Sequence, residues 1–440
     1  MSTHEPAKRF ADLVELDLQP LESGDPRLVD MSAARGNFSR THLLRKLGVD
    51  PRSYAVDRAP RRCYALLSGH RGCGKSTELR QIADKLGSPK GYRVVFVDAQ
   101  NTLDPHNLQY PDLFLSLASE LVSGLREREI ELDKVHYERL QQWFSTRIES
   151  HQSTREFAVE IKAGAKVEAG LPLLGKLFAA CANAFRSNST YKTELRKIVQ
   201  NSFSEFAEAF NLFIKAAEEA LGRIGWHGRI LFVVDGLDRL STEDARRFFV
   251  TDINQLQQVE GVFLYVAPIH MLYTSNAVNQ AFTTYKLPMI KLTEKGSDER
   301  IESAYEALRT LVYRRVDPAL FSGGEVVDTL ITHSGGHPRD LIRLLSYAYE
   351  SAEREILDAG AAESAIQRMA SEYNRLLHTS DYPLLRRIDD SPKRQAPSEE
   401  RVHELLHNLV LLEYNDYWWQ THPLVRRLPG YDNAGKSTPV

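Results

Sequence analysis

The residues best suited to chemistry are the run Gly69-His70-Arg71-Gly72-Cys73-Gly74-Lys75-Ser76, which fits the pattern G-x-x-x-x-G-K-[ST]. In such a loop the glycines let backbone amides turn inward onto phosphate oxygens at a helix N-terminus. The lysine adds positive charge, and the serine hydroxyl is placed to bind Mg²⁺. We therefore predict a nucleotide phosphate loop rather than a plain glycine-rich turn. The residues expected to contact ATP are Gly69, Arg71, Gly72, Cys73, Gly74, Lys75, Ser76 and Thr77.

A second run, 430–437, matches the same pattern and serves as an internal comparison. Only three residues follow it, so no helix can form there to aim its amides at a phosphate. No buried strand precedes it. We interpret this second match as a coincidence in a flexible tail.

An apolar strand that ends on Asp235 is the usual partner of a phosphate loop, because its carboxylate orders Mg²⁺ or the waters around it. Hydrolysis also needs a carboxylate that orients the attacking water. Gly236 cannot supply one, which leaves Asp238 as the best candidate. The alternative, that Asp238 caps the next turn or pairs with Arg239, is equally open.

Three further polar residues stand where a nucleotide sensor could lie. His270 follows the apolar strand 262–266, and Arg339 opens a helix after Gly336-His337-Pro338. Arg339 could reach the phosphates and make the position of a helical lid depend on the nucleotide. For Arg339 a surface position on that helix is an equal alternative, and we interpret His270 and His337 as structural.

Short apolar runs alternate with helical patterns, which indicates an α/β fold with a parallel sheet covered on both faces. The predicted strands are 63–68, 93–97, 230–234, 262–266 and 287–292. Lys75 and Asp235 are 160 positions apart, with one clear strand between them, so the helical block at about 103–225 is an insertion in the nucleotide domain. Within that block Val199, Phe203, Phe206, Phe210 and Phe213 form one apolar stripe of core or helix-pair type.

These patterns divide the chain into successive regions. The predicted division is 1–52 N-terminal segment, 53–300 ATPase core with its insertion, 301–388 helical lid, 389–400 linker, 401–430 winged-helix-like module and 431–440 flexible tail.

Composition narrows the function classes. The net charge is −3, and 42% of the 440 residues are hydrophobic, as in an ordinary globular protein and unlike a disordered or coiled-coil chain. The balanced charge argues against a dedicated nucleic-acid binder. Three scattered cysteines support neither a disulfide framework nor a zinc site. Without a signal peptide or a long apolar run, we expect a cytoplasmic protein with no membrane partner.

The ordered segments GHRGCGKSTEL, VVDGLDRL, YVAPIH, LPMIKL and SGGHPRDLIRLL resemble those of bacterial AAA+ ATPases of the STAND type, over about residues 60–350. The resemblance implies a three-layer P-loop ATPase core, a helical lid and often a winged-helix module. It also implies ATP and Mg²⁺ as cofactors, a homo-oligomer controlled by nucleotide, and relatives in anti-phage defence. On this basis the catalytic residues are Lys75, Asp235, Asp238 and Arg339, with Ser76 and Asp235 on the metal.

Two departures from the AAA+ pattern bear on activity. Gly236 stands where a glutamate is usual, and Lys286 stands where many AAA+ ATPases place an arginine finger. Hydrolysis that is slow or depends on assembly is therefore expected. No effector motif is recognisable, so an effector is expected to be a separate protein.

Three functions remain open at this level. The first is a regulatory ATPase that controls a partner effector. The second is a DNA-associated loader or transposition-type regulator that uses Trp418, Trp419, Arg426 and Arg427. The third is a nucleotide-binding scaffold that does not hydrolyse ATP.

Overall fold

The computed structural model describes residues 5–35, 40–104, 107–149, 154–156, 159, 170–186, 191–274, 276–391, 399–414 and 418–434. The chain divides into two compact units. The first, unit 1, contains residues 1–38, 69–80 and 286–440, and the second, unit 2, contains residues 39–68 and 81–285. Each unit is described by itself.

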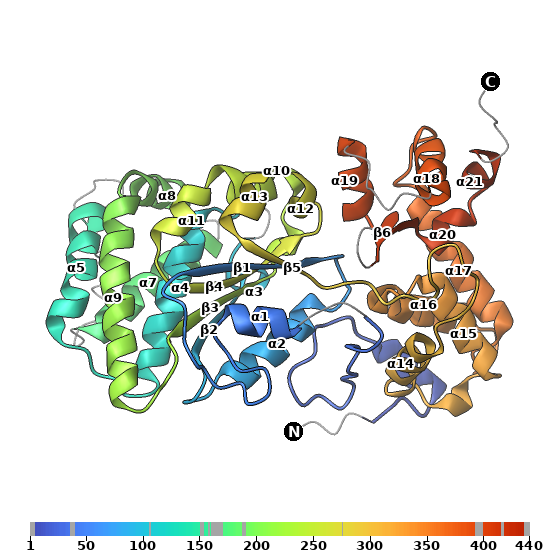
Figure 1. Cartoon of the computed structure of the whole chain (residues 1–440), viewed down its shortest axis with the longest axis horizontal. Coiled ribbons are helices and arrows are strands. Elements are labelled where there is room, and N and C mark those ends of the chain that lie inside the picture. Colours follow the sequence, from blue (N-terminus) through green and yellow to red (C-terminus); the bar gives the residue numbers. More distant parts are fainter. Residues whose placement is uncertain are drawn as a thin grey trace. The chain divides into compact units, whose positions relative to one another are not determined.

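Unit 2 is built on a five-stranded sheet with the order β2-β3-β4-β1-β5 (Figure 1). The strands are β1 (Cys63–Gly69), β2 (Arg93–Asp98), β3 (Ile230–Asp235), β4 (Val262–Pro268) and β5 (Thr283–Lys286). β2 pairs with β3, and β3 with β4, in parallel. All residues of β3 and β4 are buried, as expected for strands covered on both faces. The predicted α/β class and four of the five predicted strands are confirmed.

The fifth predicted strand is wrong. The run 287–292 is not a strand, and β5 ends at Lys286, just before it. Pro288 has no backbone N–H to donate to a ladder, which disfavours a strand there. The run is apolar because Leu287, Met289 and Ile290 are buried in irregular structure.

Between β2 and β3, every element among the described residues is a helix, and turns and irregular segments connect these helices. Its helices are α3 (Ala99–Thr102), α4 (Tyr110–Arg126), α5 (Lys134–Phe144), η2 (Ser145–Glu149), α7 (Leu171–Arg186), α8 (Lys192–Asn201) and α9 (Phe203–Arg223). α4 packs on β2 and on α7, and α5 packs on α9. Figure 1 shows α5, α7, α8 and α9 gathered into one bundle. The phenylalanine stripe lies wholly in the core, which confirms its structural interpretation.

The remaining helices of unit 2 are short. They are α1 (Arg40–Lys46), η3 (Leu237–Arg239), α10 (Thr242–Arg246), η4 (Arg247–Thr251), α11 (Ile253–Gln258), α12 (Met271–Thr274) and α13 (Asn276–Ala281). η3 begins two residues after the end of β3, and Asp238 lies within it.

Unit 1 contains the N-terminal segment with η1 (Phe10–Glu15), the loop 69–74 and the first turns of α2 (Lys75–Leu86). Its largest part is helical: α14 (Glu302–Tyr313), η5 (Pro318–Leu320), α15 (Gly324–Ser334), α16 (Pro338–Ser351), α17 (Ala359–Asn374) and α18 (Asp381–Asp390). α15, α16 and α17 pack on one another. α15 ends at Gly335, whose left-handed φ of 62° allows the chain to turn toward α16.

In the region expected to be a winged-helix-like module, the C-terminal part of unit 1 contains a helix and a two-stranded hairpin. They are α19 (Glu400–His407), β6 (Leu411–Glu413) and β7 (Trp419–Thr421), with β6 and β7 antiparallel. α20 (Pro423–Arg426) and α21 (Pro429–Ala434) follow. α18 packs on β7 and α21, so this part includes residues N-terminal to the predicted boundary at 401.

The second loop pattern, 430–437, does not form a phosphate loop in its described residues. Residues 430–434 lie within α21, and a Cβ on Gly430 would stand 2.4 Å from the Tyr382 ring. Gly430 therefore allows close packing. The predicted flexible tail does not begin at residue 431, because Tyr431 is buried and donates to Asp389. Residues 435–440 and most of the predicted linker lie outside the described residues.

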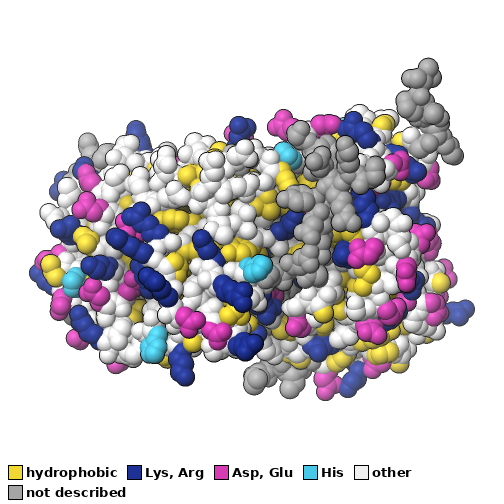
Figure 2. Space-filling view, viewed as in Figure 1, with side chains coloured by type: hydrophobic (Ala, Val, Ile, Leu, Met, Phe, Trp, Pro, Cys, Tyr) yellow, Lys and Arg dark blue, Asp and Glu magenta, His cyan; other side chains and the backbone are white. Residues whose placement is uncertain are grey.

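No helix among the described residues combines the length and apolar character needed to cross a bilayer. On the face shown in Figure 2, Lys and Arg side chains are interspersed with Asp and Glu. This mixture agrees with the nearly balanced charge of the whole sequence.

Candidate functional site

The loop 69–74 connects the end of β1 to the start of α2, as a phosphate loop requires. Gly69, Gly72 and Gly74 all have positive φ, at 156°, 91° and 103°. A Cβ on Gly72 would lie 2.9 Å from the Cβ of Arg339 and from the His337 ring. Gly72 and Gly74 have backbone conformations that favour glycine, and Gly72 also has no room for a side chain.

The Lys75 side chain folds back into the loop. Its ammonium group donates to the carbonyl oxygens of Gly69 at 3.0 Å and His70 at 2.8 Å, and the residue is only 3% exposed. The positive charge is thus held at the N-terminus of α2, where the helix dipole also favours an anion.

The segment that opens α16 lies against the same loop. The Nε2 of His337 donates to the carbonyl of Arg71 at 2.8 Å, and its Nδ1 accepts from the Asp340 amide at the N-cap of α16. A carbonyl and the next amide point in opposite directions across a trans peptide. The N–H of Gly72 therefore points away from His337.

The other predicted loop residues differ in their exposure to solvent. Arg71 is exposed and Cys73 is buried, while Ser76 and Thr77 are half-buried in the first turn of α2. The Thr77 hydroxyl accepts from the Leu21 amide at 3.2 Å. No sequence pattern indicates that contact, because Leu21 is 56 residues away.

The strand-end carboxylates lie in unit 2. Asp235 is buried at the end of β3, and its Oδ1 accepts from the Gly236 amide at 2.8 Å. The register of the sheet places Asp98, the last residue of β2, beside Asp235. Asp98 also caps α3 by accepting from the Gln100 amide. Sequence reasoning missed Asp98, although it ends an apolar strand in the same way as Asp235.

Gly236 has a left-handed φ of 84°. A Cβ at this position would stand 2.9 Å from Gln100 Cγ and 3.3 Å from Asp98 Oδ1. The space in which a glutamate side chain would begin is therefore filled by its neighbours. Asp238 follows in η3 and is half-buried.

The family comparison supplies the decisive observation. The model of the KAP family P-loop domain matches residues 58–280, just over half of the chain. The chain belongs to the KAP P-loop family. The match contains β1, the phosphate loop and the β3 carboxylate, which agrees with the predicted P-loop NTPase class.

Two solved structures are also similar to the chain, although weakly. Cdc6p from Pyrobaculum aerophilum has a TM-score of 0.35 and 11% identity, covering 93% of this chain and 98% of its own. A single-residue variant of RuvB from Thermotoga maritima has a TM-score of 0.32 and 11% identity, covering 91% and 96%. TM-scores below 0.5 do not establish a shared fold, so the assignment rests on the family match and the sheet. No curated protein matches the chain significantly.

Outside the matched KAP region, a buried polar cluster surrounds Asp340 on α16. The carboxylate lies 3.1 Å from His337 Nδ1 and 3.3 Å from His422 Nε2, and it accepts from the Tyr373 hydroxyl at 2.8 Å. Burial by itself would raise the pKa of Asp340, but the nearness of His337 and His422 holds that pKa well below its ordinary range. The cluster thus connects α16, α17 and α20 to the carbonyl of Arg71 through His337.

The hairpin also reaches the KAP phosphate loop. The Glu413 amide in β6 donates to His70 Nε2 at 2.7 Å, and the Glu413 carboxylate pairs with Lys286. Burial lowers the pKa of His70 well below its ordinary value, and the positive groups of His337, Lys75 and Lys286 lower it further. Lys286, the last residue of β5, is therefore paired within unit 1, and the run 287–292, predicted to form the strand that follows it, is not a strand.

The four residues named for DNA contact are occupied by internal contacts. Trp418 and Trp419 are buried, Arg426 pairs with Asp389, and Arg427 pairs with Glu363. His270 is buried at the start of α12, in agreement with its structural interpretation.

Proposed function

We propose that this KAP-family chain binds Mg·ATP at the loop 69–76 and hydrolyses it as a regulatory ATPase. The observation that carries the proposal is the loop itself, in which three glycines have positive φ and Lys75 is held inside at the start of α2. The family match over residues 58–280 supports the same ligand class.

The proposed roles follow the chemistry of each side chain. Lys75 neutralises phosphate charge, and Arg339 makes lid position depend on the nucleotide. Ser76 and Asp235 offer hydroxyl and carboxylate oxygens, which are the hard ligands that Mg²⁺ prefers. Bound Mg²⁺ would neutralise charge on the phosphate oxygens.

Asp238 is the proposed carboxylate that orients the attacking water, since Gly236 has no side chain. Asp98 provides a matched comparison, because it is also a carboxylate in unit 2 and stands in register with Asp235. Asn caps a helix as well as Asp does, so Asp98→Asn removes the charge without removing the cap of α3.

Steady-state phosphate release with Mg·ATP tests hydrolysis. We expect slow turnover by the wild type and a loss of about tenfold or more in Asp238→Asn, with unchanged ATP affinity. Normal turnover in Asp238→Asn together with loss in Asp98→Asn would transfer the role to Asp98. A wild type that binds ATP without turnover even when assembled would support the scaffold function instead.

The regulatory part of the proposal is that ATP drives assembly into a homo-oligomer that controls a separate effector protein in anti-phage defence, by analogy with the STAND-type ATPases whose motif order the sequence resembles. Mass photometry with ATP, with ADP and without nucleotide tests this. We expect larger species with ATP alone. A monomer under all three conditions would contradict assembly while leaving ATP binding intact.

A further inference from the structure

Arg35 belongs to the N-terminal segment, outside the matched family region, yet its side chain contacts the phosphate loop. Its Nη2 donates to the Cys73 carbonyl at 2.5 Å, and its Nη1 donates to the Pro288 carbonyl at 2.6 Å. Only 7% of the residue is exposed. One buried guanidinium group therefore connects the loop to the chain that follows β5.

The contact fixes the Cys73–Gly74 peptide of the loop. Gly74 has no Cβ and a φ of 103°, so this peptide can rotate easily without an external constraint. With the Cys73 carbonyl held by Arg35, the Gly74 N–H must point to the opposite side. The backbone N–H groups of a phosphate loop are its phosphate ligands, so holding this peptide fixes the direction of one of them. Arg35 Nη2 also lies 3.3 Å from the position of a Cβ on Gly74, so it fills the space that this glycine leaves.

Arg35 brings charge to the loop as well as geometry. Among the described residues it forms no ion pair, and both of its hydrogen-bond acceptors are neutral carbonyls. Burial lowers the pKa of Arg35, because a guanidinium cation loses hydration there, and the Glu78 carboxylate offsets part of this effect. A buried cation whose hydrogen bonds go to carbonyls is stabilised further when another anion comes near it. A bound polyphosphate would supply such an anion.

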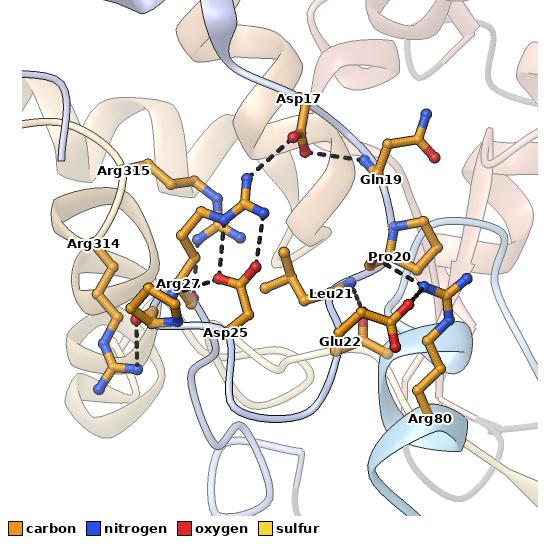
Figure 3. A network of polar contacts seen from close by, with 12 residues as sticks. Asp17, Gln19, Pro20, Leu21, Glu22, Asp25, Arg27, Arg80, Arg314 and Arg315 are labelled. Carbon is orange, nitrogen blue, oxygen red and sulfur yellow. Dashed lines mark hydrogen bonds and ion pairs between the residues drawn. The ribbon is translucent and has the colours of Figure 1, made fainter. Parts of the chain in front are cut away.

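The segment that carries Arg35 is itself anchored on both sides, and we call residues 5–35 the N-terminal strap. Figure 3 shows Arg80 of α2 donating to the Pro20 carbonyl and pairing with Glu22. The neighbouring Leu21 amide donates to the Thr77 hydroxyl. At the other end of the view, Arg27 pairs with Asp17 and Asp25.

The strap also contacts the end of α14. Arg315 donates to the Arg27 carbonyl at 3.3 Å, and Arg314 donates to the Leu28 carbonyl. Ala7 exchanges backbone hydrogen bonds with Arg315 and Asp317. The strap is therefore a fixed part of unit 1, able to hold Arg35 in place.

We infer that Arg35 is a positioning residue of the phosphate site, through which the N-terminal strap orients the loop amides toward the polyphosphate of the nucleotide. This inference rests on the proposed function. It goes further because it gives a segment outside the P-loop domain a role in nucleotide affinity.

The test compares Arg35→Met with Arg196→Met in the full-length chain. Arg196 is the control because it is similarly buried, at 6% exposed, but lies on α8 in unit 2, where it donates to Asp112 and to the Asn107 carbonyl. Titrations with Mg·ATP and with tripolyphosphate measure affinity, and thermal unfolding measures stability. Arg35→Lys is included because lysine keeps the charge but lacks the planar fork that reaches two carbonyls.

We expect Arg35→Met to bind both ligands about 10- to 100-fold more weakly, in line with the loss of a charged hydrogen bond. The affinity of Arg35→Lys should lie between those of the wild type and Arg35→Met. If the Met variant does not fold, the affinity of Arg35→Lys alone tests the inference. Arg196→Met should lower stability but keep wild-type affinity. Added guanidinium ion at millimolar concentration should partly restore ATP binding to Arg35→Met.

Two results would overturn the inference alone: wild-type affinity in both Arg35 variants, or an equal loss of affinity in Arg196→Met. A wild-type protein that binds neither Mg·ATP nor tripolyphosphate would instead overturn the proposed function, and the inference with it.

Discussion

Gly236 explains at the residue scale why the usual glutamate is absent after Asp235. Its left-handed φ and the nearness of Gln100 and Asp98 exclude a side chain, so the glycine is a requirement of this local packing. The carboxylate of Asp98, in register with Asp235, fills part of the space that a longer residue would need.

We predict that Gly236→Ala destabilises the chain by about 2 kcal/mol or more, the sum of left-handed strain and a steric clash. Gly296→Ala is the control, because Gly296 has a similar φ of 76° but nothing within 4 Å of a new Cβ. Urea unfolding of both variants separates the two effects. Equal destabilisation would mean that strain alone accounts for the glycine.

We predict a difference between two substitutions of Asp98. Asp98→Ala should lose about 1 kcal/mol of stability, because the cap of α3 is lost, whereas Asp98→Asn should stay within about 0.5 kcal/mol of the wild type. Chemical denaturation measures both. Similar losses in the two variants would show that the charge of Asp98, rather than its cap, stabilises the sheet edge.

The phosphate loop and the Asp235 strand end could be predicted from sequence because each is a local pattern with its own strand. Arg35 could not, because its partners are 38 and 253 residues away and an arginine in an irregular segment carries no pattern. The contact of His337 with the Arg71 carbonyl could not be predicted for a similar reason. The two residues are 266 positions apart, and the neighbours of His337 in sequence give no sign of it.

At the element scale, the opening of α16 is the most connected part of unit 1. His337 caps the helix and contacts the loop, while Asp340 joins α16 to α17 and α20 through Tyr373 and His422. Movement of the loop would therefore reach the C-terminal hairpin through buried polar contacts.

We predict that Asp340→Asn destabilises the chain by about 3 kcal/mol, because it leaves buried partners without a charge to compensate them. Asp390→Asn, which removes an exposed pair with Arg386, should change stability by less than about 1 kcal/mol. Urea unfolding provides the comparison. A loss no larger in Asp340→Asn than in Asp390→Asn would contradict the importance of the cluster.

Buried histidines predict a pH dependence in the same region. Burial lowers the pKa of His70 and His422, so below about pH 6.5 the unfolded chain binds more protons than the folded one. Stability is therefore full above that pH and decreases as the pH falls. Each buried neutral histidine should contribute a loss of about 1 kcal/mol by pH 5.5.

Urea unfolding from pH 7.5 to 5.5 checks this dependence. His422→Asn should reduce the slope, since asparagine can still cap α20 but does not titrate. His227→Asn, at an exposed histidine, controls for the substitution itself. An unchanged slope in His422→Asn would exclude that residue as a source.

The strand and helix order of unit 2 followed from periodicity, but the position of β5 did not. The run 287–292 is as apolar as a strand because it is buried, and burial alone does not distinguish a strand from an irregular segment that contains Pro288. The extent of the C-terminal part was also missed. Its packing on α18 depends on long-range contacts such as Asp389 with Arg426.

At the scale of the whole molecule, the chain is a KAP-family P-loop protein whose phosphate loop is clustered with the strap, the helical region and the C-terminal hairpin. The family match ends at residue 280, so most of the groups that contact the loop lie beyond the P-loop domain. Contacts of the loop with the strap, the helical region and the C-terminal hairpin are consistent with the proposed regulatory ATPase.

The most direct test of this account is calorimetric titration of Mg·ATP into the wild type, Lys75→Ala and Lys436→Ala. The two variants remove the same residue type from the two matches to one pattern, at 69–76 and 430–437. We predict saturable binding by the wild type and by Lys436→Ala, and a loss of about 100-fold or more in Lys75→Ala. Unchanged affinity in Lys75→Ala, or no binding by the wild type, would contradict the account.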